Sequence, residues 1–156
     1  MTGRIAARLA ELGLELPQVA APVAAYVPAV RTGNLIHTSG QLPFVGGELP
    51  VTGKVGAAVS AETAQELAAT CALNAVAAVA ALLDGDLDRV VRIVKVVGFV
   101  ASDPTFTGQP GVINGASTLL GEIFGDAGVH ARSAVGVAVL PLDSPVEVEI
   151  VAEITD

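Results

Sequence analysis

The chain has 156 residues, of which 52% are hydrophobic and 15% charged, so it is not a disordered polyelectrolyte and fits one domain with an aliphatic core. The net charge is −8 and the eight lysines and arginines are scattered, which argues against binding to nucleic acid or an anionic membrane surface. One cysteine precludes an intramolecular disulfide and the N-terminus lacks the apolar core of a signal peptide, so we expect a cytoplasmic protein.

Apolar spacing and turn residues divide the first half of the chain into helices, strands and loops. The expected elements are a short amphipathic helix over residues 3–13, strands over 24–31 and 34–39, a Gly- and Pro-rich loop over 40–56, and a helix over about 61–83. Ser60 is suited to cap this second helix, because its hydroxyl can accept a backbone N–H of the first turn. Residues 67–83 approach the length of a membrane span, but their small alanines favour a helix packed on a sheet.

The second half of the chain is expected to form three strands and one helix. These are a strand over residues 90–101, a helix over 111–124, and strands over 131–140 and 146–154. The full order predicts one α+β domain, residues 1–156, with two helices on one face of a mostly antiparallel sheet and residues 1–17 as an N-terminal helical extension. A short loop joins the last two strands, so we expect them to pair as a hairpin.

The alternation within this expected hairpin predicts which side chains face the helices. In strand 131–140 the valines share one face, which we expect to pack under the helices. The small residues share the other face with Arg132 and leave room for the close approach of another subunit. In strand 146–154 the glutamates Glu147, Glu149 and Glu153 alternate with aliphatic residues and need water or partners, since three dry carboxylates would repel each other.

Arg132 is the only cationic side chain between Val96 and Asp156. A lone guanidinium in an apolar strand is costly to desolvate unless it meets an anion. Guanidinium also matches a carboxylate with two parallel hydrogen bonds. We therefore interpret Arg132 as the anchor for a small carboxylate ligand. The alternative is a structural ion pair at a subunit interface.

Two signatures, in this order along the chain, carry a family resemblance. They are Ser39-Gly40-Gln41, and Arg132-Ser133 followed by Leu140-Pro141 and Val146-Glu147-Val148-Glu149. Over roughly residues 20–155 the chain resembles the Rid superfamily of reactive intermediate deaminases, also called YjgF-like and formerly "endoribonuclease L-PSP" proteins. Its N-terminal helix and longer Gly/Pro loop resemble a longer branch of that superfamily.

The resemblance implies a chorismate-mutase-like α+β fold that assembles as a homotrimer with ligand clefts between subunits. It also implies hydrolysis of small 2-imino or enamine acids to 2-keto acids and ammonium, with no metal or organic cofactor. By position, Arg132 would bind the substrate carboxylate with help from the backbone of Gly40. Glu147 would position or activate the attacking water, and Tyr26 would line the cleft. Ala134 stands where the family usually has a cysteine, which is not the expected nucleophile.

The expected hairpin places Glu147 near its closed end and Arg132 near its open end. Within one subunit the two side chains would then be about 20 Å or more apart, at ~3.3 Å per residue. A site that uses both residues therefore requires an oligomer. Two other functions stay open: a non-catalytic 2-keto acid binding protein, which would need Arg132 but not Glu147, and an endoribonuclease, which the acidic charge disfavours. The two histidines, His37 and His130, are too few and too distant in sequence to predict a metal site.

Overall fold

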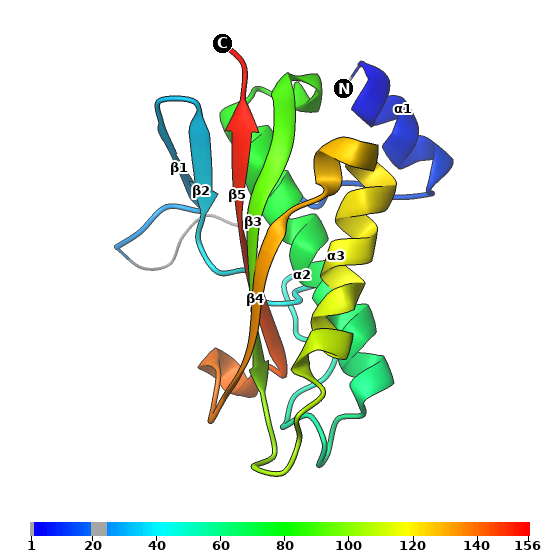
Figure 1. Cartoon of the computed structure of the whole chain (residues 1–156), viewed down its shortest axis with the longest axis vertical. Helices are drawn as coiled ribbons and strands as arrows, with labels where there is room; N and C mark the ends of the chain where they lie inside the picture. Colours follow the sequence, from blue (N-terminus) through cyan, green and yellow to red (C-terminus); the bar gives the residue numbers. More distant parts are fainter. Residues whose placement is uncertain (1, 20–24) are drawn as a thin grey trace.

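The structure, a computed structural model, describes residues 2–19 and 25–156. A five-stranded sheet carries α2 and α3 on one face, and α1 lies at the end of these helices (Figure 1). The elements are α1 (Arg4–Glu11), β1 (Ala29–Thr32), β2 (Leu35–Thr38), α2 (Ala61–Leu82), η1 (Leu87–Arg89), β3 (Val90–Ala101), α3 (Gln109–Phe124), η2 (Gly125–Gly128), β4 (Ala131–Val137), η3 (Pro141–Asp143) and β5 (Val146–Ile154). The expected strand 24–31 begins at Ala29, and its residue 24 lies outside the described residues.

The strand order is β1-β2-β5-β3-β4, and β3–β4 is the one parallel pair in this sheet. The expected α+β class and mostly antiparallel sheet are confirmed. The expected hairpin of the last two strands is wrong, because β5 lies between β2 and β3 while β4 is an edge strand. The reason is that α3 serves as the crossover from β3 to β4, which makes these strands parallel. The segment around η3 then carries the chain past the end of β3 to the sheet centre.

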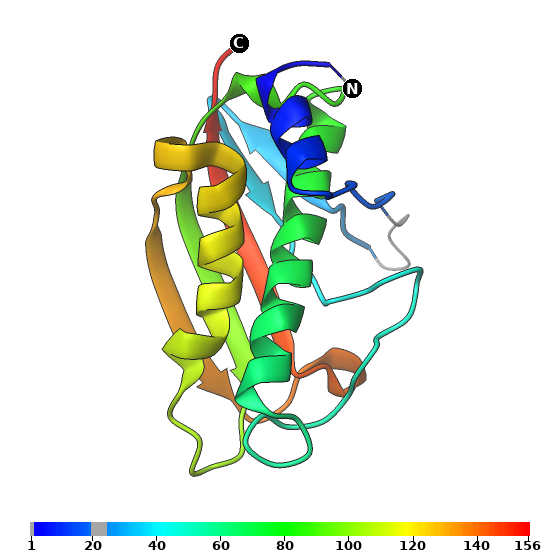
Figure 2. The same cartoon turned by 90° about the vertical axis from the view of Figure 1, so that its right-hand side faces the viewer.

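The core lies between the sheet and the helices (Figure 2). β5 shows strict alternation, with its aliphatic residues from Val146 to Ile154 buried and the residues between them half-buried. α2 is apolar and long enough to pass as a membrane span by length and composition. Its buried residues, from Ala64 to Ala80, nevertheless pack in this core, as the sequence predicts for a helix on a sheet. The opposite face of the sheet, which carries Glu147, is called the open face below.

The expected orientation of strand 131–140 is reversed in the structure. Ala134 packs against the core, whereas Val135 is 44% exposed and Val139 is 68% exposed. The small residues face α3 because of the parallel register with β3, which pairs Ala134 with Gly98 and Gly136 with Val100, both buried on the helix side. The valines are thus left on the open face.

Close packing of α2 against α3 depends on Gly115. A methyl group at this position would overlap the backbone carbonyl of Gln65 on α2 and lie 2.8 Å from its carbon. We expect Gly115→Ala to lower the free energy of unfolding by about 1–3 kcal/mol, because backbone cannot yield as a flexible side chain does. Chemical denaturation would measure this change. Gly121→Ala is the matched control, since nothing lies within 4 Å of the added methyl. A Gly115→Ala protein as stable as the control would contradict the packing argument.

The N-terminal helix is anchored by Asp88 of η1. Its carboxylate oxygens accept hydrogen bonds from the backbone N–H groups of Arg4 and Ile5, each at 2.8 Å, and these bonds lower the pKa of Asp88. The carboxylate thereby supplies the cap that Gly3, at the N-cap, cannot provide. Ile5 and Leu9 are buried in the core. The helical part of the expected extension is therefore integral to the domain.

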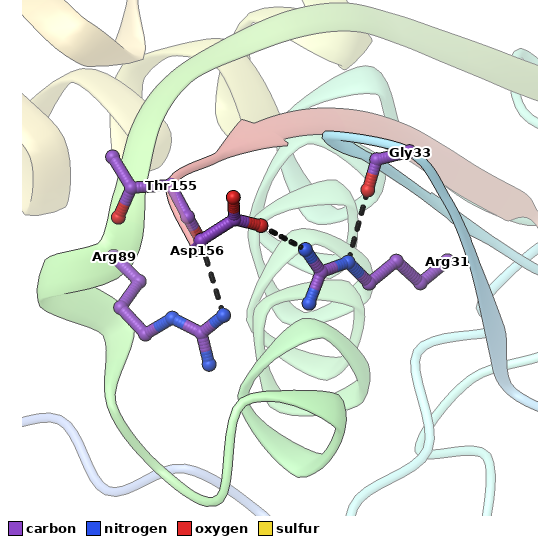
Figure 3. A network of polar contacts seen from close by, with 5 residues as sticks. All are labelled: Arg31, Gly33, Arg89, Thr155 and Asp156. Carbon is purple, nitrogen blue, oxygen red and sulfur yellow. Dashed lines mark hydrogen bonds and ion pairs between the residues drawn. The ribbon is translucent and has the colours of Figure 1, made fainter.

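Two sets of polar contacts fix the loop and the chain end. Asn74 Nδ2 donates to the carbonyls of Leu42 and Phe44, at 2.9 and 3.2 Å, which holds the Gly- and Pro-rich loop on α2. Figure 3 shows the C-terminal contacts, where Arg31 reaches Asp156 Oδ1 at 2.9 Å and Arg89 donates to the Thr155 carbonyl. These contacts tie the end of β5 to β1 and to the start of β3.

Candidate functional site

Arg132 lies at the start of the edge strand β4 and is half-buried against α3. Its Nη1 donates to Asn114 Oδ1 at 2.8 Å and to Ser117 Oγ at 3.2 Å, and its Nη2 donates to the Pro110 carbonyl at 3.3 Å. All three acceptors are neutral. Within residues 2–19 and 25–156 the salt bridges involve other cations, and none neutralises Arg132. Its positive charge is therefore held in place without being compensated.

The arrangement of hydrogen bonds leaves a defined part of the guanidinium available. Of its five N–H donors, two on Nη1 and one on Nη2 are engaged by α3. The Nε donor and the second Nη2 donor have no hydrogen-bond partner among the described parts of the chain. Nε and Nη2 are adjacent nitrogens of one planar group, and a carboxylate can engage such a pair with two parallel hydrogen bonds.

Residues on α3 that support Arg132 are only partly recognisable in the sequence. Asn114 and Ser117 are one helical turn apart and both contact Nη1. Asn114 is one of the residues that resemble the family, and a structural role is its simpler interpretation. No motif singles out Ser117. The available signal is a pair of polar residues at i and i+3 within an otherwise apolar helix.

Glu147 lies on the open face of β5, directly over Gly40. A Cβ at position 40 would overlap Glu147 Oε1 and lie 2.8 Å from its carboxyl carbon, so another residue here would force the Glu147 side chain to leave this position. Partial burial raises the pKa of Glu147, and the neighbouring Glu149 raises it further. The structure thus brings together two of the residues selected from the sequence.

Tyr26 lies close to this pair along the chain that enters β1. Ser39 Oγ donates to the Val27 carbonyl at 2.6 Å, and Ser39 N–H donates to the Pro28 carbonyl at 2.8 Å. The segment that contains Tyr26 therefore runs beside the segment that leads to Gly40. The Tyr26 side chain is 56% exposed, so its ring remains available for contacts with a ligand or a neighbouring molecule.

Arg132 is not brought together with Glu147 in one subunit. Arg132 pairs with Val96, which is buried on the helix side, whereas Glu147 pairs with Phe99 on the open face. The two partner positions on β3 are three residues apart, and β3 lies between β4 and β5. The Cα atoms of Arg132 and Glu147 are therefore separated by about 14 Å within the sheet. The expected value of about 20 Å rested on the wrong hairpin. The inference that one chain cannot place both side chains on one small molecule remains.

Two hollows in the described part of the chain do not contain this set of residues. A hollow of about 100 Å³ on the open face is lined by residues that include His37, Lys95 and Glu149. A wider one, of about 500 Å³, lies beside the start of α1 among residues that include Asp84 and Asp88. Neither includes Arg132 or Glu147. Among the described residues no group of three or more His, Cys, Asp or Glu side chains is placed to hold a metal ion.

Comparison with known proteins agrees with this architecture. The family model described as "YjgF/chorismate mutase-like, putative endoribonuclease" matches residues 6–154. Protein TCP17 of Trypanosoma cruzi is 48% identical over 158 residues, covering 99% of this chain and 97% of that protein.

Two solved structures extend the comparison. A "putative endoribonuclease" from Shewanella oneidensis MR-1 has a TM-score of 0.92 and 35% identity, covering 97% of this chain and all (100%) of that one. E. coli TdcF with bound serine has a TM-score of 0.62 and 27% identity, covering 89% of this chain and 93% of that one. The family match spans nearly the whole chain, and the chain therefore belongs to the YjgF family, the Rid superfamily that its motifs resemble.

Proposed function

We propose that this protein is a cytoplasmic enzyme that hydrolyses small 2-imino or enamine acids to 2-keto acids and ammonium, without a metal or organic cofactor. The observation that carries the proposal is the uncompensated guanidinium of Arg132, with two donors on adjacent nitrogens left for a carboxylate. The serine in the TdcF structure, a small molecule that also bears a carboxylate, supports this ligand class.

The proposed reaction uses Arg132 for binding and Glu147 for proton transfer. Arg132 and the backbone of Gly40 hold the substrate, and Glu147 orders a water molecule against the imine carbon. As the new C–O bond forms, Glu147 accepts a proton from this water and returns it to the imine nitrogen, which gives a neutral carbinolamine and restores the carboxylate. The hydroxyl proton of the carbinolamine then passes to the nitrogen and the C–N bond breaks, which leaves the 2-keto acid and ammonia. Ammonia takes up a proton from water to become ammonium.

The distribution of exposed apolar residues supports a shared site between subunits. One group surrounds β1 and the following loop: Tyr26, Val27, Val30, Phe44 and Val45. A second group flanks and includes β4: Val129, Val135, Val139 and Leu142. Glu147 and Gly40 lie nearer to the first group. Arg132 lies on β4, the strand of the second group.

These two groups provide what a closed ring requires, namely different surfaces that meet head to tail. When the first surface of one subunit meets the second surface of the next, the carboxylate and the guanidinium approach from two chains. The separation within one chain then no longer prevents their cooperation. Three subunits per ring is the number that the family resemblance implies, so we propose a homotrimer.

Two other functions are less well supported by the residues. A 2-keto acid binding protein would use Arg132 but has no need for a carboxylate of raised pKa over Gly40. An endoribonuclease, as family names have it, would need cations along a phosphate backbone, whereas this chain has a net charge of −8.

Glu147→Gln tests whether the protein is an enzyme. With freshly generated imino acids of different side-chain size, we expect ammonium release to fall by about 10²-fold or more, because the amide cannot accept the proton. The matched control is Glu153→Gln, on the same face of β5. In the wild-type protein, activity should decline as the pH falls through the raised pKa of Glu147, since only the ionised carboxylate is a base. Undiminished turnover in Glu147→Gln, at any substrate size, would remove this role.

A further inference from the structure

A chain of hydrogen bonds continues from Arg132 through Ser117 to His130 and the η2 turn. Ser117 Oγ lies 3.2 Å from Arg132 Nη1 and 2.8 Å from His130 Nε2. On the far side of the imidazole, His130 Nδ1 lies 2.6 Å from the Gly128 carbonyl. This chain links helix α3 to the segment before β4, and Arg132 is its outermost member.

For a neutral imidazole, the chemistry of each group sets the direction of these bonds. A carbonyl oxygen can only accept, so His130 Nδ1 carries the proton toward Gly128. In the neutral imidazole Nε2 is then an acceptor, and it takes the Ser117 hydroxyl hydrogen. The Ser117 oxygen is left with lone pairs for Arg132 Nη1. His130 thereby orients the hydroxyl so that it accepts from the guanidinium.

The turn that begins this chain is itself rigidly packed. Gly128 is buried, and a Cβ there would overlap the Leu120 carbonyl of α3. The Gly128 carbonyl is consequently held at a fixed position relative to α3, and through it the imidazole. The sequence motifs assign no role to Ser117 or His130.

We infer that Ser117 and His130 are positioning residues that fix the Arg132 guanidinium, without neutralising it, so that its two remaining donors face the ligand carboxylate. A carboxylate partner in place of Ser117 would orient the arginine equally well but would cancel the charge that attracts the ligand. A hydroxyl partner avoids this loss. The inference rests on the proposed role of Arg132 and concerns ligand affinity, not the proton transfer assigned to Glu147.

The test measures pyruvate binding by calorimetry and, separately, KM and kcat for imine hydrolysis. Ser117→Ala should weaken pyruvate binding and raise KM by about three- to tenfold, the effect of one hydrogen bond, while kcat changes little. Ser117→Thr retains the hydroxyl and should behave like the wild type. His130→Ala should show a similar but smaller effect, and His130→Gln, which restores an acceptor for the hydroxyl, should recover affinity.

Combining the variants separates positioning from general damage. Because His130 acts through the Ser117 oxygen, the Ser117→Ala/His130→Ala double variant should bind pyruvate no more weakly than Ser117→Ala alone. Additive losses, or equal losses in Ser117→Thr and Ser117→Ala, would overturn the inference. Thermal denaturation of each variant shows whether the fold is retained.

Failure of the proposed function gives a different result. If the wild type binds pyruvate but hydrolyses no imine, the deaminase assignment falls and the positioning role is still decided by the binding data. If the wild type binds no pyruvate and shows no turnover, both are overturned.

Discussion

Arg132→Ala is expected to abolish hydrolysis of 2-imino acids and binding of 2-keto acids while the protein stays folded. The side chain supplies the charge and both donors that are left for the carboxylate. Hydrogen bonds from a charged donor contribute about 1.5–3 kcal/mol each, so losing two of them predicts a decrease in kcat/KM of about 10²-fold or more. The fold should persist, because Arg132 makes its contacts at the rim of α3 and outside the hydrophobic core.

The measurements for this variant are ammonium release, pyruvate affinity and thermal denaturation. Arg92→Ala is the control, since Arg92 is an exposed arginine of β3 paired with Glu153. Arg132→Lys should also lose most activity, because a single ammonium cannot present two donors from adjacent nitrogens. Full activity in Arg132→Ala would refute the assignment of the carboxylate anchor.

Mixed oligomers of Arg132→Ala and Glu147→Gln chains are expected to recover activity that neither variant has alone. Each variant lacks one component, but an interface between an intact Arg132 and an intact Glu147 is complete. In a head-to-tail trimer that contains both kinds of subunit, one of the three interfaces contains both intact residues, whichever kind is in the majority. Activity of these mixed particles should therefore return to roughly a third of the wild-type value per subunit.

The experiment requires co-expression of the two variants with different affinity tags and isolation of particles that carry both. The control is a chain with both substitutions, co-expressed with either single variant, because no interface then contains both intact residues. Mixed particles that remain inactive would show that the two side chains do not form a site across subunits. A monomeric wild-type protein would lead to the same conclusion.

Elements with a strong local signal are predictable from the sequence. The β-branched run of β3, the strict alternation of β5 and the alanine-rich α2 with its Ser60 cap each determine their own conformation. The capping hydroxyl accepts the Thr63 N–H at 3.1 Å, as expected. Burial of β5 residues follows directly from the period of two, since this strand has neighbours on both sides.

Strand β4 shows where such reasoning fails. Its valines are bulkier than its alanines and glycine, so apolarity alone assigns the valines to the core. The actual orientation follows from the parallel register with β3, which is a property of the assembled sheet and not of the strand alone. Its pairing is also missed, because a short loop before β5 favours a hairpin locally, while the crossover through α3 has already placed β4 beyond β3.

The candidate site is predictable only in part, because the relations between its residues depend on how the elements pack together. Motifs select Arg132, Glu147, Gly40 and Tyr26 by position, and the overlap of a side chain at 40 with Glu147 gives one physical reason for that glycine. Ser117 and His130 lie outside the motifs, and their relation to Arg132 appears only when α3, η2 and β4 are placed together.

Residue 40 and Glu147 compete for the same space. Any larger residue at 40 must displace the carboxylate, so we expect such a substitution to impair the proposed reaction even though the backbone conformation does not require a glycine. A relative that binds the ligand without catalysing a reaction would not be restricted in this way. We expect such a relative to have a larger residue at position 40 and no acid at position 147.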